Sequence, residues 1–192
     1  MNPMMFPKML SSHAEGWEWL MRVHPSVPRM YLAYVVPMSA IPPAMLLYAW
    51  HAYSGAPLLE ISRNQAMLLA AVFFVSELLM VPIMAWVVQR IGAVADAQAS
   101  YRDAFALAAV VPTPLWLMPV ALFVPSVVFH AAAMLLALAA SAALIYQGVD
   151  RVYRLEDEGH SRLAAGSVFA AGLVAWVLMM GLAFVSWGMV LT

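Results

Sequence analysis

The sequence predicts an all-α polytopic membrane protein with five transmembrane helices. Five apolar runs of about twenty residues follow one another along the chain, and each is long enough to cross a bilayer core of ~30 Å as a helix. Hydrophobic residues make up 65% of the 192 residues and charged residues 10%, against roughly 45–50% and 25% in soluble domains. A soluble fold of this size cannot bury that much apolar surface, whereas lipid can cover it.

The five spans are expected at residues 30–50, 66–88, 105–124, 127–146 and 163–191. They form one transmembrane domain, residues 30–192, which follows a cytoplasmic N-terminal segment of residues 1–29. Only Val124, Pro125 and Ser126 join the third span to the fourth. Because this connection is so short, the two helices must form an antiparallel hairpin.

A short amphipathic helix is expected within residues 1–29. Ser12 and Glu15 fit a capping box, in which the two side chains satisfy each other's backbone donors. Trp17, Leu20 and Met21 then fall near one helical face, as in helices that lie in the membrane interface. A frayed tail is the alternative.

Basic residues in the loops predict the orientation of the chain. Short cytoplasmic loops carry an excess of lysine and arginine. Arg63 stands alone on one side of the predicted membrane. The N-terminus is therefore expected in the cytoplasm and the C-terminus outside. The basic residues on the other side are Lys8, Arg22, Arg29, Arg90, Arg102, Arg151, Arg154 and Arg162.

Charge and composition exclude several functional classes. A net charge of −1 gives no basic surface for nucleic acid. The chain has no cysteine, which excludes disulfides, thiolate metal sites and cysteine nucleophiles. The 16 methionines suggest copper(I) ligands, with Met1, Met4, Met5 and Met9 as candidates. Methionine more often fills apolar cores, so no metal or cofactor is expected.

Glu77 is the most informative single residue, because it lies near the middle of the second span. A charged side chain at that depth costs roughly 2.5–3.5 kcal/mol on insertion scales, so the neutral acid is favoured. One interpretation is a proton or cation relay that faces the interior of the bundle. The other is a neutral acid that bonds a neighbouring helix and stabilises packing. A single carboxyl group does not form a relay by itself.

His130 and Thr113 complete the candidate intramembrane polar site. His130 lies about one turn into the fourth span, and a water molecule would join it to Glu77 if the second and fourth helices touch. A bond from His130 to a backbone carbonyl is the alternative, and we favour it. Thr113 lies between two prolines and can bond the carbonyl groups that they free. No metal-binding histidine motif is present.

Prolines interrupt three of the spans. Each removes a backbone hydrogen bond and clashes with the preceding turn. Broken helices line the binding sites of many transporters, but prolines also form plain kinks. The positions are Pro37, Pro42 and Pro43 in the first span, Pro82 in the second, and Pro112, Pro114 and Pro119 in the third.

The fourth and fifth spans carry stripes of small residues at four-residue spacing. Such stripes let helix backbones approach closely. The pattern does not distinguish packing within one chain from packing between two, although the former is more common. The stripes are Ala133, Ala137 and Ser141, and Ser167, Ala171 and Ala175, which Gly181 and Gly188 extend.

The order of several short motifs resembles the Yip family (YIPF type), and in particular bacterial YohC-like inner membrane proteins. Trp19 followed by His24 and Pro25 stands before the first span, and the Pro112-Thr113-Pro114-Leu115 step resembles the third span of the family. The resemblance implies a five-helix bundle with a cytoplasmic N-terminus. Eukaryotic members are linked to Rab-type GTPases, a role that does not carry over to a bacterial member. Glu77 is not part of the resemblance.

The sequence is compatible with two functions. The first is a membrane-organising or interaction protein of the bacterial inner membrane without catalytic activity. Its partners are lipids, other membrane proteins or further copies of the chain. The second is a small transporter or channel that uses the kinked helices and Glu77. An intramembrane enzyme is disfavoured, because the sequence shows no paired carboxylates, nucleophile–base pair or metal set.

Overall fold

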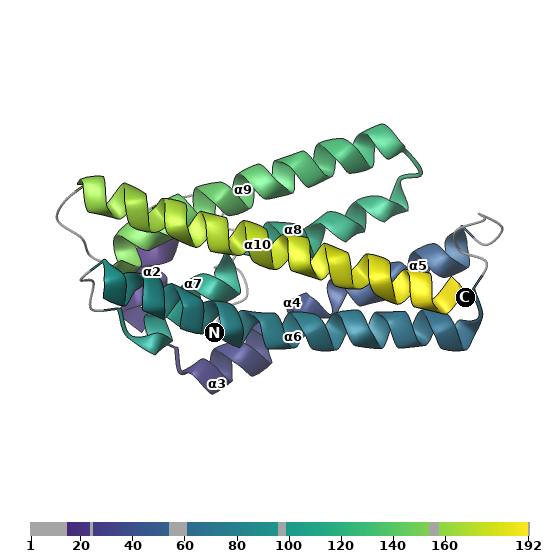
Figure 1. Cartoon of the computed structure of the whole chain (residues 1–192), viewed down its shortest axis with the longest axis horizontal. Coiled ribbons are helices and arrows are strands. Elements are labelled where there is room, and N and C mark those ends of the chain that lie inside the picture. The colour runs from purple at the N-terminus through teal and green to yellow at the C-terminus, as the bar shows by residue number, and fades with distance from the viewer. Residues whose placement is uncertain (1–14, 24, 54–60, 96–98, 154–157, 192) are drawn as a thin grey trace.

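The computed structural model of the chain describes residues 15–23, 25–53, 61–95, 99–153 and 158–191. Within these ranges, five helical segments are long and apolar enough to cross a membrane. They run side by side as one bundle (Figure 1). This confirms the predicted five-helix membrane fold. The segments are Val27–Ala52, Arg63–Val94, Tyr101–Phe123, Val127–Tyr153 and Gly159–Met189.

Proline divides two of these segments into shorter pieces. The first consists of α3 (Val27–Met30), the π-helical turn η1 (Tyr31–Val35), α4 (Val36–Ser39) and α5 (Ile41–Ala52). The third consists of α7 (Tyr101–Val110), α8 (Thr113–Leu117) and the 3₁₀ helix η3 (Met118–Phe123). A proline occupies one of the first two positions of α3, α4, α5, α8 and η3, where its N–H is not needed within the piece of helix that begins there.

The other three spans are single helices: α6 (Arg63–Val94), α9 (Val127–Tyr153) and α10 (Glu158–Leu191). Helix α6 continues through Pro82. It begins at a capping box, in which the Ser62 hydroxyl accepts from the Gln65 N–H and the Gln65 side chain accepts from the Ser62 N–H. Ser126 ends the tight turn after η3 and accepts from the Phe129 N–H.

Helix α7 forms the centre of the bundle. All of its residues from Ala104 to Val110 are buried, and Phe105 is only 2% exposed. Its alanines let α6, α9 and the first span pack close around it. Tyr153 on α9 adds a long-range tie, because its hydroxyl donates to the Val88 carbonyl of α6 at 2.5 Å.

The helix α2 (Glu15–Val23) packs on the same core. Trp17 and Leu20, two residues of its predicted apolar face, are each 1% exposed. Gly148 of α9 accommodates the indole: a Cβ atom at this glycine would lie 2.7 Å from the Trp17 ring and would also collide with Leu107. The apolar face of α2 is therefore buried against protein. The predicted cap residue Ser12 lies outside the described residues.

Helix α10 lies on the outside of the bundle. In its most apolar stretch only 6% of residues are buried within the chain. It packs on α6 and α9 and crosses the bundle on a diagonal course (Figure 1). Helices α9 and α10 lie close together where α9 ends and α10 begins, and they diverge toward the C-terminal end of α10 (Figure 1).

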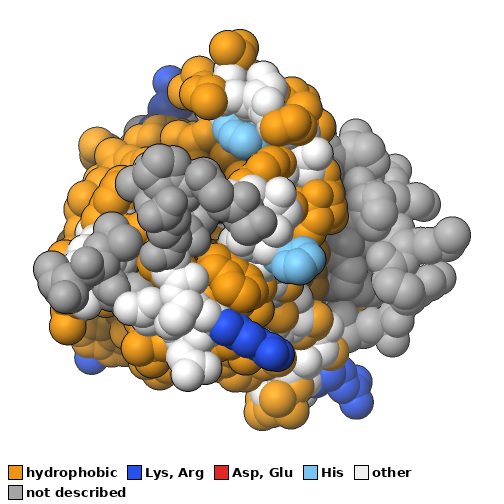
Figure 2. Space-filling model, turned by 90° about the vertical axis from the view of Figure 1, so that its right-hand side faces the viewer, with side chains coloured by type: hydrophobic (Ala, Val, Ile, Leu, Met, Phe, Trp, Pro, Cys, Tyr) orange, Lys and Arg blue, Asp and Glu red, His pale blue; other side chains and the backbone are white. Residues whose placement is uncertain are grey.

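Arginines gather at the end of the bundle where α2 packs. Arg90 stands near the end of α6, Arg102 near the start of α7, Arg151 near the end of α9 and Arg162 near the start of α10. Arg63 begins α6 at the opposite end. Hydrophobic side chains dominate the described surface of that opposite end (Figure 2). Which end faces the cytoplasm stays a prediction.

Candidate functional site

A cavity of about 470 Å³ lies inside the bundle. Helices α6, α7, α8, α9 and α10 supply most of its wall, and η3 and Pro42 of α5 complete it. Nearly all of the lining side chains are apolar, including six methionines and two tryptophans. The volume falls within the range of ~300–1,000 Å³ that is usual for small-molecule sites.

The wall follows from helical periodicity. On α6, the residues at positions 73, 77, 80, 81, 84 and 88 recur every three or four residues, so they share one face and turn it toward the cavity. Residues 134, 138, 141, 142 and 145 do the same on α9. The break in the third span adds to the space, since Pro112 and Pro119 both line it.

Glu77 is the sole ionisable side chain among the described residues that line the cavity. It is 8% exposed, and its Oε2 atom has no hydrogen-bond partner among the described residues. A buried carboxyl oxygen without a partner is uncommon, because the loss of its hydration is not compensated. When ionised, this group can bind a cation; when neutral, it can donate and accept hydrogen bonds.

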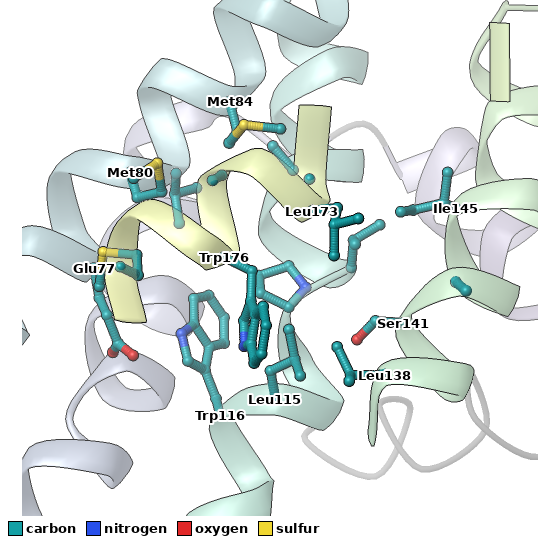
Figure 3. Close-up of a pocket in the computed structure, with 18 of the residues that line it drawn as sticks. Glu77, Met80, Met84, Leu115, Trp116, Leu138, Ser141, Ile145, Leu173 and Trp176 are labelled. Carbon is teal, nitrogen blue, oxygen red and sulfur yellow. The ribbon is translucent and has the colours of Figure 1, made fainter. Parts of the chain in front are cut away.

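Ser141 is the second polar group of the cavity. It is 6% exposed, and its hydroxyl also lacks a partner within the described part of the chain. Figure 3 shows Glu77 and Ser141 on opposite sides of the cavity, with the indole rings of Trp116 and Trp176 between them. The site thus has two unpartnered polar ends and an aromatic middle.

The comparison with protein families decides the identity of the fold. A model of the Yip1 domain matches residues 8–179, which is most of the chain. The chain belongs to the Yip1 domain family. No curated protein and no solved structure matches it at a significant level.

Of the family-like motif residues before the first span, Pro25 lies in the described part. Its carbonyl accepts a hydrogen bond of 3.0 Å from Arg102 Nε, which ties the segment before the first span to α7. His24 and the side chain of Trp19 lie outside the described residues. In this Yip1 domain, the Pro112-Thr113-Pro114 step forms the junction between α7 and α8.

Thr113 serves this junction and does not line the cavity. Its hydroxyl donates to the Val110 carbonyl at 2.6 Å, which returns a bond to a carbonyl next to the break. The Tyr34 hydroxyl is 2.5 Å from Thr113 Oγ1. Because Thr113 has already used its one proton, Tyr34 is the donor. This buried pair joins the π-helical turn of the first span to the break in the third.

His130 also lies away from the cavity lining. Its Nε2 atom is 3.2 Å from the Ala121 carbonyl of η3, so it contacts a backbone carbonyl next to the turn between the third and fourth spans. The structure does not bring Glu77, His130 and Thr113 together. Among the described residues, no three histidine, aspartate or glutamate side chains gather as a metal site.

The predicted kink positions fall into four groups. Pro42, Pro112 and Pro119 line the cavity. Pro43 and Pro114 are buried near helix starts, and Pro37 is exposed in α4. Pro82 stands within the continuous helix α6.

Sequence reasoning missed Ser141, Trp116 and Trp176 as parts of a site. The sequence pattern marks Ser141 only as a small residue in a stripe that favours helix packing. The two tryptophans did carry a signal. Both stand well inside their spans, whereas tryptophan in membrane proteins is enriched at the two interfaces.

Proposed function

We propose that this Yip1 domain is a membrane-organising or interaction protein that acts without catalysis in the bacterial inner membrane. The surface of α10 carries the proposal. This helix has the highest mean hydropathy of the five spans, 2.4, yet it contributes least to the core of the chain. A helix of that kind is free to contact lipid or another membrane protein.

Exposed residues on α10 form a seam, which we call the outward face. Successive residues of this face are alternately four and three positions apart in the sequence, the spacing at which two helices pack side by side. Gly181 and Gly188 leave the seam open, since a Cβ atom at either would meet nothing within 4 Å. Small residues let a second helix approach closely. The outward face consists of Leu163, Ser167, Ala170, Val174, Val177, Gly181, Phe184 and Gly188.

The arginine distribution supports the rest of the proposal. The end of the bundle that carries Arg90, Arg102, Arg151 and Arg162 would face the cytoplasm, since short cytoplasmic loops are rich in basic residues. The C-terminus would then lie outside. Fusion of a reporter enzyme to each terminus measures this directly.

Crosslinking from single cysteines tests the interaction, because the natural chain has none. Gly181→Cys places a thiol on the outward face. Gly172→Cys is the matched control: it changes the same residue type on the same helix, but Gly172 lines the cavity and faces Ile145. In native membranes, mild oxidation or a photoreactive maleimide should give a crosslinked protein product at position 181 and none at position 172. Equal products at both positions, or none at either, would contradict the proposal.

A second function, a small transporter or channel, is favoured by one observation. Glu77 is buried, lacks a partner among the described residues and lines a cavity next to broken helices, as binding-site carboxyls do in transporters. This function predicts a pH-dependent flux in proteoliposomes that Glu77→Gln abolishes. The membrane-organising function predicts that Glu77→Gln alters stability and leaves no flux to lose.

A further inference from the structure

We propose that the cavity binds a hydrophobic organic cation, with the Glu77 carboxylate as its counter-ion and the indole rings of Trp116 and Trp176 against its apolar body. This ligand class goes beyond the membrane-organising function. It also defines a cargo for the transport alternative, although binding alone does not require transport.

Glu77 has no countercharge among the described residues that line the cavity. Its Oε2 atom is buried and has no hydrogen-bond partner among the described residues. Side chains from seven helical elements line the cavity, and none of those described is basic or, apart from Glu77, titratable. A carboxylate in such surroundings needs a countercharge, because desolvation of an isolated ion is too costly. The described lining of the cavity does not supply that charge, so the complementary ligand carries it.

Two aromatic side chains of the lining favour a cation independently of Glu77. Trp116 lies next to Glu77 in the cavity, and Trp176 follows on the side toward Ser141 (Figure 3). Indole faces attract cations more strongly than other aromatic rings do, and they do so best where water is excluded. Methionine sulfur is polarisable and adapts to ligands of different shape. Met80, Met84 and Met180 belong to the same lining.

Size and access fit a ligand of moderate volume. A cavity of ~150 Å³ accommodates benzene, so about 470 Å³ corresponds to about twenty non-hydrogen atoms. Two lining residues of α10, Phe169 and Leu173, are 37% and 45% exposed. The cavity therefore opens toward lipid where α9 and α10 diverge, and an apolar cation dissolved in the membrane can reach it.

A neutral hydrogen-bonding ligand is the competing occupant, since a neutral Glu77 and Ser141 could both bond a hydroxyl or carbonyl group. The two ligands differ in one step. When a cation binds, a neutral Glu77 releases its proton to water, so the net charge inside the cavity is unchanged. A neutral ligand releases no proton. Glutamine at position 77 keeps the hydrogen-bonding groups and removes the charge, so it separates the two cases.

The experiment uses two probes of the same shape, each with about twenty non-hydrogen atoms, to match the cavity volume. Methyltriphenylphosphonium is a cation, and triphenylphosphine oxide is a neutral hydrogen-bond acceptor. Calorimetry on the full-length protein in detergent micelles, with partition into empty micelles subtracted, measures both affinities. We expect one phosphonium per chain, bound about tenfold or more tightly than the oxide, since loss of a buried charge pair usually has at least that effect.

Three variants complete the test. Glu77→Gln should remove the preference for the phosphonium, and Glu77→Asp should retain most of it. Asp103→Asn, which makes the same carboxylate-to-amide change at the start of α7 and outside the cavity lining, should leave it unchanged. The proposal is overturned if the wild-type protein binds the oxide as tightly as the phosphonium, a result that needs no variant to fold. A preference that survives in Glu77→Gln would overturn it equally. Neither result affects the crosslinking test of the outward face, so the two proposals can fail separately.

Discussion

Helices α7 and α10 are both transmembrane segments, yet one is almost entirely inside the protein and the other almost entirely outside. In the most apolar stretch of the span that contains α7, 50% of residues are buried, against 6% for α10. The exposed helix is the more apolar of the two, with a mean hydropathy of 2.4 against 1.8. In water the reverse would be expected.

The difference shows what places a helix at the centre of a membrane bundle. Lipid covers apolar side chains as well as protein does, so hydropathy gives no preference for the interior. Close packing and polar ties do. Helix α7 has four alanines between Ala104 and Ala109, and α8, which continues it, is joined to the first span through Thr113 and Tyr34. Among the described residues, no hydrogen bond ties the outward face of α10 to another helix, since the Ser167 hydroxyl donates to Leu163 of α10 itself.

The largest expected difference in stability is between alanine substitutions of two phenylalanines, one in α7 and one in α10. Phe105 in α7 is 2% exposed and Phe184 in α10 is 78% exposed. Phe105→Ala should lower the free energy of unfolding by about 3–5 kcal/mol, because it leaves a cavity in the core. Phe184→Ala should change it by less than about 0.5 kcal/mol, as exposed substitutions do. Titration with SDS in mixed micelles measures both. A large loss for Phe184→Ala would mean that a partner covers α10.

The next largest expected difference in stability is between alanine substitutions of two glycines. Gly148→Ala puts a methyl group against Trp17 and Leu107, and overpacking of this kind costs about 1–3 kcal/mol. Gly181→Ala meets open space and should be neutral or stabilise the helix by up to about 1 kcal/mol. Thermal denaturation monitored by size-exclusion chromatography compares the two. If Gly181→Ala leaves stability intact but weakens self-association, the outward face is an interface.

The smallest effect concerns the hydrogen bond beside the helix break. Tyr34→Phe removes the donor to Thr113 and should cost about 0.5–1.5 kcal/mol. Tyr146→Phe, on an exposed position of α9, is the control and should have little effect. Both variants enter the same SDS titration as the phenylalanine pair. Equal values for the two would show that this tie does not help to hold α7 and α8 in the centre.

Much of the fold was predictable because its signals are local. Apolar runs of sufficient length predict the spans, and Pro112 and Pro114 predict the break between α7 and α8. The depth of Glu77 in its helix follows from counting residues. A Ser-x-x-Gln signal at Ser62 and Gln65 also marks the start of α6, although the predicted span began a few residues later.

The cavity was not predictable, because it depends on which helices pack together. No local pattern states that α9 and α10 diverge, or that Ser141 lies across a cavity from Glu77. The burial of α2 is a similar case. Its apolar face fits lipid and protein equally well, and the space at Gly148, which accommodates Trp17, is not visible in a local sequence pattern. The sequence therefore leaves the partners of amphipathic and small-residue faces open.

The length of α10 has a further consequence. Its membrane-spanning part of 31 residues measures about 46 Å at 1.5 Å per residue, whereas a typical hydrocarbon core is ~30 Å thick. The diagonal course of the helix shortens its projection across the bundle (Figure 1). Hydrophobic mismatch of this kind makes the tilt of a helix respond to its surroundings. A thicker bilayer would let α10 stand more upright and change its angle to α9. The contact between α9 and α10, which share the wall of the cavity, is therefore where membrane thickness would act on this bundle.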